Sequence, residues 1–398
     1  MSFPLEGVTV LDFSHALAGP YCTMLMAQYG ATIVKVEGVA SGDIGRTWGP
    51  PFVGPESSFF LGLNPGKQAV AIDLKDPRGV DLCLGLARHA DVLIENFRPG
   101  TMERLGLGFP AVAAANPRLV YCSISGYGQT GPRRDDPAMD LILQASSGLI
   151  SVTGSPSGEV ARCGHSVADI TAGMFALIGI LLALKAREQT GRGQLVDVSM
   201  LDAMISAMSS NYANFFGSGV VPRPWGTAFG WIVPYACFPT KDREIAIAVA
   251  SDKLWRSFCQ AVGREDWVDD PRFATNAVRV KNRAELEPAI VEVLRQRSAA
   301  EWAEVFREHG VPHTPVQNLA DVAADPHAAA REMFQTLSHP TAGTVTVTGP
   351  PLKLSESEAR VGPAAPLAAR DTRAVLRDLL GRSEAEIAQL ASEGVIAV

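Results

Sequence analysis

The sequence predicts an α/β protein of two domains, in which the larger domain is built on a mainly parallel β-sheet. Strand-like apolar runs alternate with helical periodicity along the first 200 residues, the pattern of a sheet covered by helices on both faces. The length of 398 residues exceeds one typical core, and 47% hydrophobic residues can fill more than one. The periodicity breaks over 209–231, which marks a change of domain.

The elements of the larger domain follow in chain order. Short apolar or β-branched runs predict strands over 8–13, 31–36, 70–74, 91–95 and 119–123, and helical spacing predicts helices over 21–28 and 79–90. A long helix is expected from Ser166 to about Gln189, ended by Gly191, with a strand over 193–201 after it. Its apolar run, 172–184, is shorter than the ~20 residues that cross a bilayer, so we expect a buried helix.

The second domain is expected over 232–331, after a linker over 209–231. A hairpin of 233–238 and 244–249 is followed by helices over 253–262, 283–295 and 299–309. The alternation over 344–348 predicts another strand, and helices over 368–380 and 383–392 close the chain.

Composition excludes several classes of protein. With 35 Lys and Arg against 42 Asp and Glu, the net charge is −7, which argues against binding nucleic acid or an anionic membrane surface. The first residues lack the features of a secretory signal, so we expect a cytoplasmic protein. Six scattered cysteines predict free thiols, and no histidine pair has the spacing of a metal site, so no bound metal is expected. Phosphate-binding loops of the G-x-G-x-x-G and P-loop types are absent, which disfavours a nicotinamide enzyme or an NTPase.

Asp169 is the sharpest candidate for chemistry. It falls in the first turn of the long helix, where free N–H groups and the helix dipole favour an anion, and the flanking Ala168 and Ile170 cannot neutralise it. A partly desolvated carboxylate is a usable nucleophile. The structural alternative is a capping box, with Ser166 as N-cap and Asp169 at the third helical position. Spacing alone favours the capping box.

Several motifs, taken together and in this order, resemble the class III CoA-transferase family, also called the CaiB/BaiF family. They are Leu17-Ala18-Gly19-Pro20, Val34-Lys35-Val36-Glu37 with Gly42-Asp43, Glu95-Asn96-Phe97-Arg98-Pro99-Gly100, Ser125-Gly126-Tyr127-Gly128-Gln129-Thr130-Gly131-Pro132, and Thr190-Gly191-Arg192-Gly193-Gln194 with Val196-Asp197-Val198. The resemblance covers nearly the whole chain and implies that Asp169 attacks an acyl-CoA thioester. An acyl-aspartyl anhydride and then an aspartyl-CoA thioester would form, with acyl-CoA and a small carboxylic acid as substrates and no permanently bound cofactor.

The resemblance also implies which residues contact CoA. They are Leu17, Ala18, Ile72, Lys75, Asn96, Phe97, Arg98, Arg104, Met139, Asp140 and Met200. Lys75, Arg98 and Arg104 would meet the phosphates, although each basic residue alone is more simply a solvated surface charge. A basic residue common in the family after Val36-Glu37 is here Gly38, which leaves one nucleotide contact open.

Met139 separates two chemistries of the family. Members that racemise α-methylacyl-CoA carry a histidine at this position, and methionine cannot exchange a proton, so a transferase is preferred to a racemase. His165 is a candidate base or acyl contact, and a structural histidine is the alternative. A third hypothesis is a protein that binds acyl-CoA without catalysis.

Two segments, 46–54 and 225–235, indicate the substrates. They look most like the branch of the family that acts on dicarboxylates, and this resemblance implies succinyl-CoA as the donor. Arg46 could pair with a distal carboxylate, or could instead tie down its own loop. Gly226, Thr227 and Phe229 are further substrate candidates, and Phe229 stands where the branch commonly has a histidine. The glycine-run loop of formyl-CoA:oxalate transferases is missing, which disfavours oxalate as the acceptor.

For the fold, the resemblance implies a large Rossmann-like domain from both chain ends, residues 1–208 with 332–398. It also implies a smaller α/β domain between them and a homodimer of two interlocked chains.

Overall fold

The computed structural model describes residues 2–398 and divides them into two compact units. The first unit contains the chain up to Ile150, then Arg162–Val220 and His327–Val398, so both chain ends contribute to it. The second contains Ser151–Ala161 and Val221–Pro326. The segment 209–231, predicted as a linker, begins with helix α10 (Ser209–Ser218), which belongs to the first unit.

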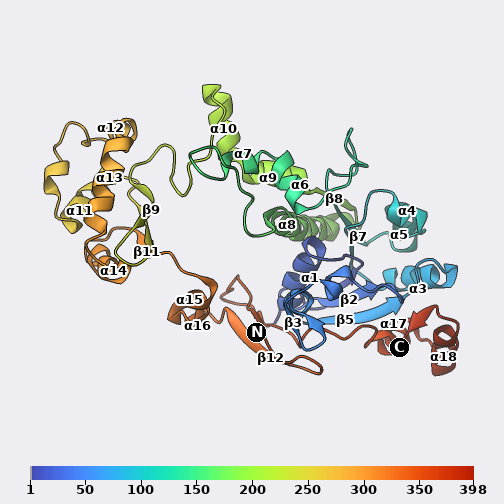
Figure 1. Cartoon of the computed structure of the whole chain (residues 1–398). Helices are drawn as coiled ribbons and strands as arrows, with labels where there is room; N and C mark the ends of the chain where they lie inside the picture. Colours follow the sequence, from blue (N-terminus) through green and yellow to red (C-terminus); the bar gives the residue numbers. More distant parts are fainter. Residues whose placement is uncertain (1) are drawn as a thin grey trace. The chain divides into compact units, whose positions relative to one another are not determined.

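A seven-stranded sheet forms the centre of the first unit, with the strand order β14-β5-β2-β1-β6-β7-β8 (Figure 1). All its neighbours pair in parallel except β14, which is antiparallel to β5. The strands are β1 (Thr9–Asp12), β2 (Thr32–Glu37), β5 (Lys67–Ile72), β6 (Val92–Glu95), β7 (Val120–Ser125), β8 (Leu195–Ser199) and β14 (Ile396–Ala397). The prediction of an α/β chain with a mainly parallel sheet is confirmed, whereas the two-residue β14 was not predicted.

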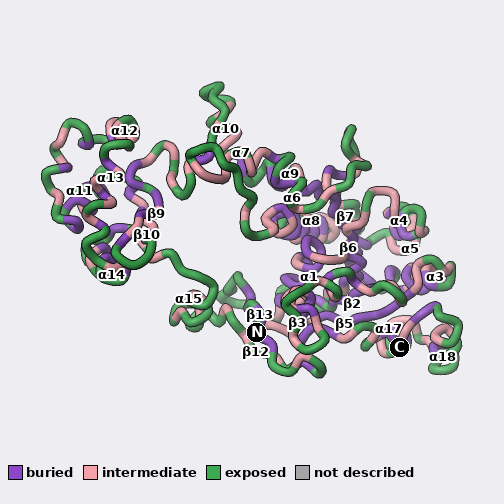
Figure 2. Tube along the Cα trace, viewed as in Figure 1, coloured by how far each residue is buried: buried purple, intermediate pink, exposed green. Residues whose placement is uncertain are grey.

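Helices cover the two faces of this sheet and bury separate apolar cores. One core includes α1 (Ala18–Gln28) and α8 (Val167–Thr190), and the other includes α3 (Pro77–Ala87), α17 (Thr372–Leu380) and α18 (Glu384–Ser392). Figure 2 shows β2, β5, β6 and β7 as mostly buried, in contrast to the exposed α10. The remaining helices of this unit are α2 (Ser58–Leu63), α4 (Thr101–Arg104), α5 (Phe109–Ala115), α6 (Asp140–Ser146), α7 (Leu149–Val152), α9 (Met200–Ala207) and α16 (Pro326–Ala330, at the boundary).

Two small hairpins complete the first unit. The strands β12 (Phe334–His339) and β13 (Gly343–Thr348) pair antiparallel, as do β3 (Phe52–Val53) and β4 (Glu56–Ser57). The alternation predicted over 344–348 is therefore a strand. A 3-10 helix, η1 (Ile44–Thr47), precedes β3.

The second unit has its own sheet and core. Strands β9 (Tyr235–Pro239), β10 (Glu244–Ala248) and β11 (His313–Pro315) form an antiparallel sheet, in which the predicted hairpin is β9 and β10. Aromatic residues such as Trp255, Phe258 and Trp302 fill the core. The helices are α11 (Asp252–Ala261), η2 (Glu265–Trp267), α12 (Asn276–Lys281), α13 (Arg283–Leu294), α14 (Ala299–Glu308) and α15 (Leu319–Ala323).

Helix α8 has 24 residues and two different faces. Its small residues, including Ala168, Ala172 and Ala176, are buried, while Met174, Phe175, Ile178, Leu181 and Leu182 on the other side are exposed in the single chain. Within residues 2–398 it is the one helix long and apolar enough to cross a membrane, a test of length and composition that core helices of soluble proteins also pass. The expectation of a buried helix is met on the alanine face alone.

Glycine allows α8 to approach α1 closely. A Cβ atom added to Gly173 would lie 2.6 Å from the carbonyl oxygen of Ala18, a backbone atom that cannot swing away. We therefore expect Gly173→Ala to lower the free energy of unfolding by about 1–3 kcal/mol, because it forces the two helices apart. Gly217→Ala in α10, where a Cβ meets nothing within 4 Å, is the matched control and should be neutral or stabilising. Thermal unfolding of both variants measures the difference, and equal melting temperatures would contradict this packing.

Candidate active site

A cavity of about 430 Å³ opens in the first unit at the carboxyl ends of the central strands. Its walls come from the turn after β1, the turn after β6, the end of β7 and the start of α8. The chain order reverses here, because β2 lies on one side of β1 and β6 on the other. Ligands of open α/β sheets bind at such a switch point.

The cavity brings together most of the residues predicted from the resemblance. Asp169 lies in its wall, together with eight of the eleven predicted CoA contacts, which are Leu17, Ala18, Asn96, Phe97, Arg98, Met139, Asp140 and Met200. These residues are up to 183 positions apart in the chain, from Leu17 to Met200. The parallel sheet and α8 bring them to one place.

Asp169 is not occupied with capping its helix. Ser166 makes no side-chain hydrogen bond to the helix start, so the capping box proposed as the structural alternative is not formed. The carboxylate of Asp140 takes this role, since its Oδ1 accepts the backbone N–H of Ala168 at 2.9 Å. Among residues 2–398 no hydrogen bond to the Asp169 carboxylate is found, which leaves it available for chemistry.

The surroundings of Asp169 disfavour its charged form. Burial, and secondly the nearby Asp140 carboxylate, raise the pKa of Asp169 from 3.8 to about 7. No cation among residues 2–398 contributes to the pKa of Asp169, and the N–H of Ala168 in the first turn of α8 is already bound by Asp140. Asp169 is thus a weakly solvated carboxylate that ionises near neutral pH, as a reactive acid does.

The turn after β1 and the turn after β6 are joined by hydrogen bonds in the cavity wall. The side-chain amide of Asn96 accepts the backbone N–H of His15 at 2.8 Å and donates to the His15 carbonyl at 2.9 Å. The ring of His15 also meets the edge of Phe97, with ring centres 5.2 Å apart. The amide of Asn96, predicted to contact CoA, therefore also holds the β1–α1 turn in place.

Three predicted CoA contacts lie outside the cavity wall. Ile72 is fully buried within β5, while Lys75 and Arg104 are exposed. Arg104 donates to the hydroxyl of Thr101, and neither Lys75 nor Arg104, nor the exposed Arg98, forms an ion pair with a residue in 2–398. Their charges are free to meet an anionic ligand.

The structure supports the structural interpretation of Arg46. Its guanidinium binds both oxygens of Glu37 at 2.7 Å, donates to the carbonyl of Pro366 and lies over the ring of Phe60. A guanidinium used in this way has little capacity left for a substrate carboxylate. The predicted tie of the 46–54 loop is therefore the role that its contacts favour.

The other substrate candidates stand apart from the cavity wall. His165 is exposed and does not line the cavity. Gly226, Thr227 and Phe229 belong to the second unit, where Thr227 accepts the N–H of Cys237 and Phe229 packs against Trp231 and Tyr235. Their substrate roles stay predictions.

Sequence reasoning missed several wall residues. Trp48, Phe59, Ala138 and Leu141 add apolar surface to the cavity. Trp48 is part of the segment 46–54, whose aromatic residue between glycines and prolines was a signal for a pocket wall. Ala16 has a left-handed backbone with φ of 61°, which nothing in its residue type announces.

Residues 2–398 contain no preformed site for a metal ion. No group of three or more His, Cys, Asp or Glu side chains is arranged to hold an ion. All six cysteines are free thiols, four of them buried.

Known proteins resemble this chain along nearly its whole length. Residues 5–372 match the sequence profile described as "CoA-transferase family III". Human "Succinyl-CoA:glutarate CoA-transferase" is 35% identical over 393 residues, which cover 99% of this chain and 90% of that protein. "Acetyl-CoA:oxalate CoA-transferase" of Acetobacter aceti is 38% identical over 353 residues, 88% of this chain and 89% of that protein.

A solved structure has the same fold. The crystal structure of a CAIB/BAIF family protein from Brucella suis superposes with a TM-score of 0.86 at 32% identity, and covers 95% of this chain and 100% of that one.

Proposed function

Because this chain belongs to CoA-transferase family III, we propose that it moves CoA from succinyl-CoA to a dicarboxylate, with Asp169 as the nucleophile. One observation carries the proposal. The Asp169 carboxylate, free of hydrogen bonds to residues 2–398, lines the same cavity as eight residues predicted to hold CoA. The relatives named for glutarate and oxalate both use a dicarboxylate, which favours this class of acceptor.

The reaction runs through four exchanges at one carboxylate. Asp169 attacks the thioester carbonyl of the donor and expels CoA thiolate, which gives a mixed anhydride. The thiolate then attacks the Asp169 carbonyl of this anhydride, releases the donor acid and leaves an aspartyl-CoA thioester. The acceptor carboxylate attacks that thioester and expels CoA again, and the thiolate finally takes the acceptor acyl group and frees Asp169. Each step exchanges one carboxylate or thiolate for another, so one activated acyl bond is present throughout and no water is consumed.

The partial burial of Asp169 suits this role. A carboxylate that has lost much of its water is a stronger nucleophile than a solvated one, and the apolar side chains of Trp48 and Phe59 in the same wall disfavour the water that would hydrolyse the anhydride. The raised pKa of Asp169 has the same origin.

The CoA phosphates require local cations, since the chain as a whole is acidic. Arg98 in the cavity wall, with Lys75 and Arg104, is proposed to bind them. Phe97 and the Leu17–Ala18 turn would pack against the pantetheine arm or adenine. A further basic residue after Glu37 is replaced by Gly38.

Racemisation is the disfavoured alternative. The position that would carry the proton-transferring histidine is Met139, which lines the cavity beside Asp140. A thioether cannot move a proton, so the chain lacks one half of the acid–base pair.

A homodimer is proposed from the exposed apolar side chains of α8, and the interlocking of its two chains stays a prediction from the family resemblance. Five large apolar side chains on one helix face are an unusual surface for a monomer in water. A second copy of the chain that covers this face would explain it. Light scattering should give twice the chain mass, whereas a monomer at micromolar concentration would contradict the proposal.

The acceptor is identified by a screen with mass-spectrometric detection. Succinyl-CoA or acetyl-CoA is offered as donor with glutarate, mesaconate, citramalate, oxalate and several monocarboxylates as acceptors. A new CoA thioester of one dicarboxylate is the expected product. Exchange with monocarboxylates alone would overturn the dicarboxylate assignment.

The pH dependence of the first step should report the pKa of Asp169. With a pKa of about 7 in the free enzyme, kcat/KM for the donor rises about tenfold per pH unit up to that value and then levels off. Asp140→Asn removes the carboxylate that adds to the shift, so the rising limb should move to lower pH, while burial keeps it above the usual value of 3.8. If kcat/KM of the unaltered chain levels off near pH 4, this environment for Asp169 is contradicted.

A further inference from the structure

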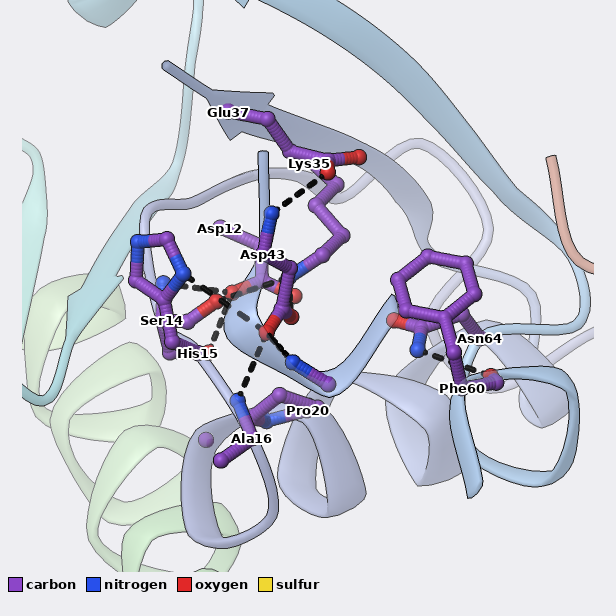
Figure 3. A network of polar contacts seen from close by, with 12 residues as sticks. Asp12, Ser14, His15, Ala16, Pro20, Lys35, Glu37, Asp43, Phe60 and Asn64 are labelled. Atoms are coloured by element: carbon purple, nitrogen blue, oxygen red, sulfur yellow. Dashed lines mark hydrogen bonds and ion pairs between the residues drawn. The ribbon is translucent and has the colours of Figure 1, made fainter. Parts of the chain in front are cut away.

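Asp43 is a buried carboxylate next to the active site, in a motif to which the proposed chemistry gives no task. It precedes η1 and is fully buried. It does not line the cavity, yet its hydrogen bonds reach the turn that does. Figure 3 shows this carboxylate between the strand that carries Lys35 and the turn at Ala16.

The geometry around Asp43 is specific. Its Oδ1 accepts the backbone N–H of Ala16 at 3.0 Å and that of Gly45 at 2.8 Å, and Lys35 Nζ lies 2.8 Å from its Oδ2. The ring nitrogen Nδ1 of His15 is 3.6 Å from Oδ1. Burial alone would raise the pKa of Asp43, but the contacts with His15, Lys35 and the Ala16 N–H hold it well below its usual range.

The N–H that Asp43 accepts belongs to a strained residue. Ala16 has a φ of 61°, a left-handed backbone that is unfavourable for a residue with a Cβ. Such a conformation persists only where the surroundings fix it. Asp43 fixes Ala16 from one side, and Asn96 fixes the neighbouring His15 from the other.

The turn that Asp43 holds forms part of the cavity wall. Ala16, Leu17 and Ala18 all lie in the wall that contains Asp169. The Ala18 carbonyl also packs onto Gly173, one helical turn after Asp169. A turn that relaxes to a right-handed backbone at Ala16 would redirect this part of the wall.

We propose that Asp43 is a positioning residue for the transfer reaction, which holds Ala16 in its left-handed conformation and thereby fixes the Ala16–Ala18 part of the cavity wall that also contains Asp169. The inference rests on the proposed function, because the turn matters for transfer only if the cavity is where transfer occurs. Asp43 itself touches no substrate in this account.

The test compares the buried Asp43 with a half-buried aspartate that makes the same two kinds of contact, a hydrogen bond from a backbone N–H and an ion pair. Asp43→Asn keeps the size of the side chain but loses the charge, and its NH₂ group must face either Lys35 Nζ or the N–H groups of Ala16 and Gly45, so these contacts are no longer all satisfied. Asp91→Asn is the matched control, because Asp91 also accepts a backbone N–H, that of Thr9 at 3.0 Å, and pairs with Arg187 at 2.9 Å. It does so at the opposite, amino-terminal end of β1.

Both variants are assayed at a temperature where circular dichroism shows them folded. We expect Asp43→Asn to lower kcat about 10- to 100-fold, a larger effect than on the KM for the donor, and Asp91→Asn to keep kcat within about twofold of the unaltered chain. Equal kcat values in the two variants would overturn the inference and leave the proposed function standing. An unaltered chain that transfers no CoA to any acid would overturn both.

Rescue by glycine separates positioning from general stability. Glycine adopts positive φ without strain, so Ala16→Gly supplies by itself the conformation that Asp43 enforces. We expect the double variant Ala16→Gly with Asp43→Asn to regain at least about fivefold in kcat over Asp43→Asn. The same glycine added to Asp91→Asn should bring no such gain. A double variant no faster than Asp43→Asn would also overturn the inference.

Discussion

Replacing Asp169 by asparagine is expected to reduce CoA exchange by about 10⁴-fold or more, because an amide cannot form the anhydride. Loss of activity alone would not identify a nucleophile, since a misfolded variant is also inactive. The raised pKa of Asp169 supplies a second, opposite readout. A folded-state pKa of about 7 against 3.8 means that the folded chain binds this proton more tightly than the unfolded chain does.

The sign of the effect on stability follows from this linkage. The contribution of Asp169 to stability is full below pH 3.8 and is lost as the pH rises through about 7, where the ionised carboxylate is partly buried. At pH 8 we therefore expect Asp169→Asn to melt at the same or a higher temperature than the unaltered chain, while it is inactive. A melting temperature lowered by several degrees at pH 8 would contradict a functional, structurally costly carboxylate.

Glu386→Gln is the control for this variant. Glu386 occupies the same third helical position in α18, where it forms a true capping box with Ser383. Its replacement should lower stability slightly and leave exchange intact. The comparison separates an acid that caps a helix from one that reacts.

Replacing Asp12 by alanine is expected to cost about 3–5 kcal/mol of unfolding free energy, the largest effect we predict on stability. Asp12 lies fully buried at the end of β1, where its carboxylate pairs with Lys67 Nζ at 3.2 Å and accepts the hydroxyl of Thr23 at 2.6 Å. Burial alone would raise the pKa of Asp12, but Lys67 and Lys35 lower it to about 2, so the group is charged in the folded chain.

One buried ammonium group loses its ion-pair partner in this variant. The side chain of Lys67 is completely buried and keeps only a hydrogen bond to the Pro20 carbonyl in α1, whereas the equally buried Lys35 loses the attraction of Asp12 but still pairs with Asp43 and donates to the Ser14 carbonyl. Denaturation by urea measures the loss. Lys185→Ala, which breaks an exposed pair with Glu188, is the control and should change stability by less than about 1 kcal/mol. Comparable values for the two variants would contradict the buried network.

The buried ion pairs of Asp12 and of Asp43 stabilise the same turn. Asp12, Lys35, Lys67 and Asp43 make contacts with the turn that connects β1 to α1 or with one another. Asp43 is the member whose hydrogen bond reaches the cavity wall, at Ala16 (Figure 3). An acidic protein with few charges places four of them, two of each sign, in the core at this point. The stability of this turn and the shape of the active site are therefore linked.

The strands of the large sheet could be predicted because each is an apolar run between turn residues. Val92–Glu95 and Val120–Ser125 lie within two residues of their predicted bounds. Parallel strands buried on both faces give this signal, which depends on local composition alone. The same holds for α8, whose end at Gly191 has the left-handed backbone that its sequence indicates.

The site could be predicted as a set of residues, but not as a set of contacts. The motif segments identified eight wall residues and Asp169, yet spacing favoured a capping box at Ser166 that does not form. The helix is capped instead by Asp140, 28 positions upstream of Ala168, a long-range contact that no local pattern encodes. Arg46 and Glu37 likewise pair across nine residues through the folding of η1 beneath β2.

The covalent step at Asp169 is tested most directly by mass spectrometry after incubation with acyl-CoA alone. Trypsin releases the peptide Cys163–Lys185, in which Asp169 is the only acidic residue. With a reductant present to remove any disulfide between CoA and Cys163, this peptide should carry CoA as a thioester. Hydroxylamine should convert the adduct to a hydroxamate at Asp169. An active enzyme whose Cys163–Lys185 peptide stays unmodified, or whose CoA is attached to another residue, would contradict the account.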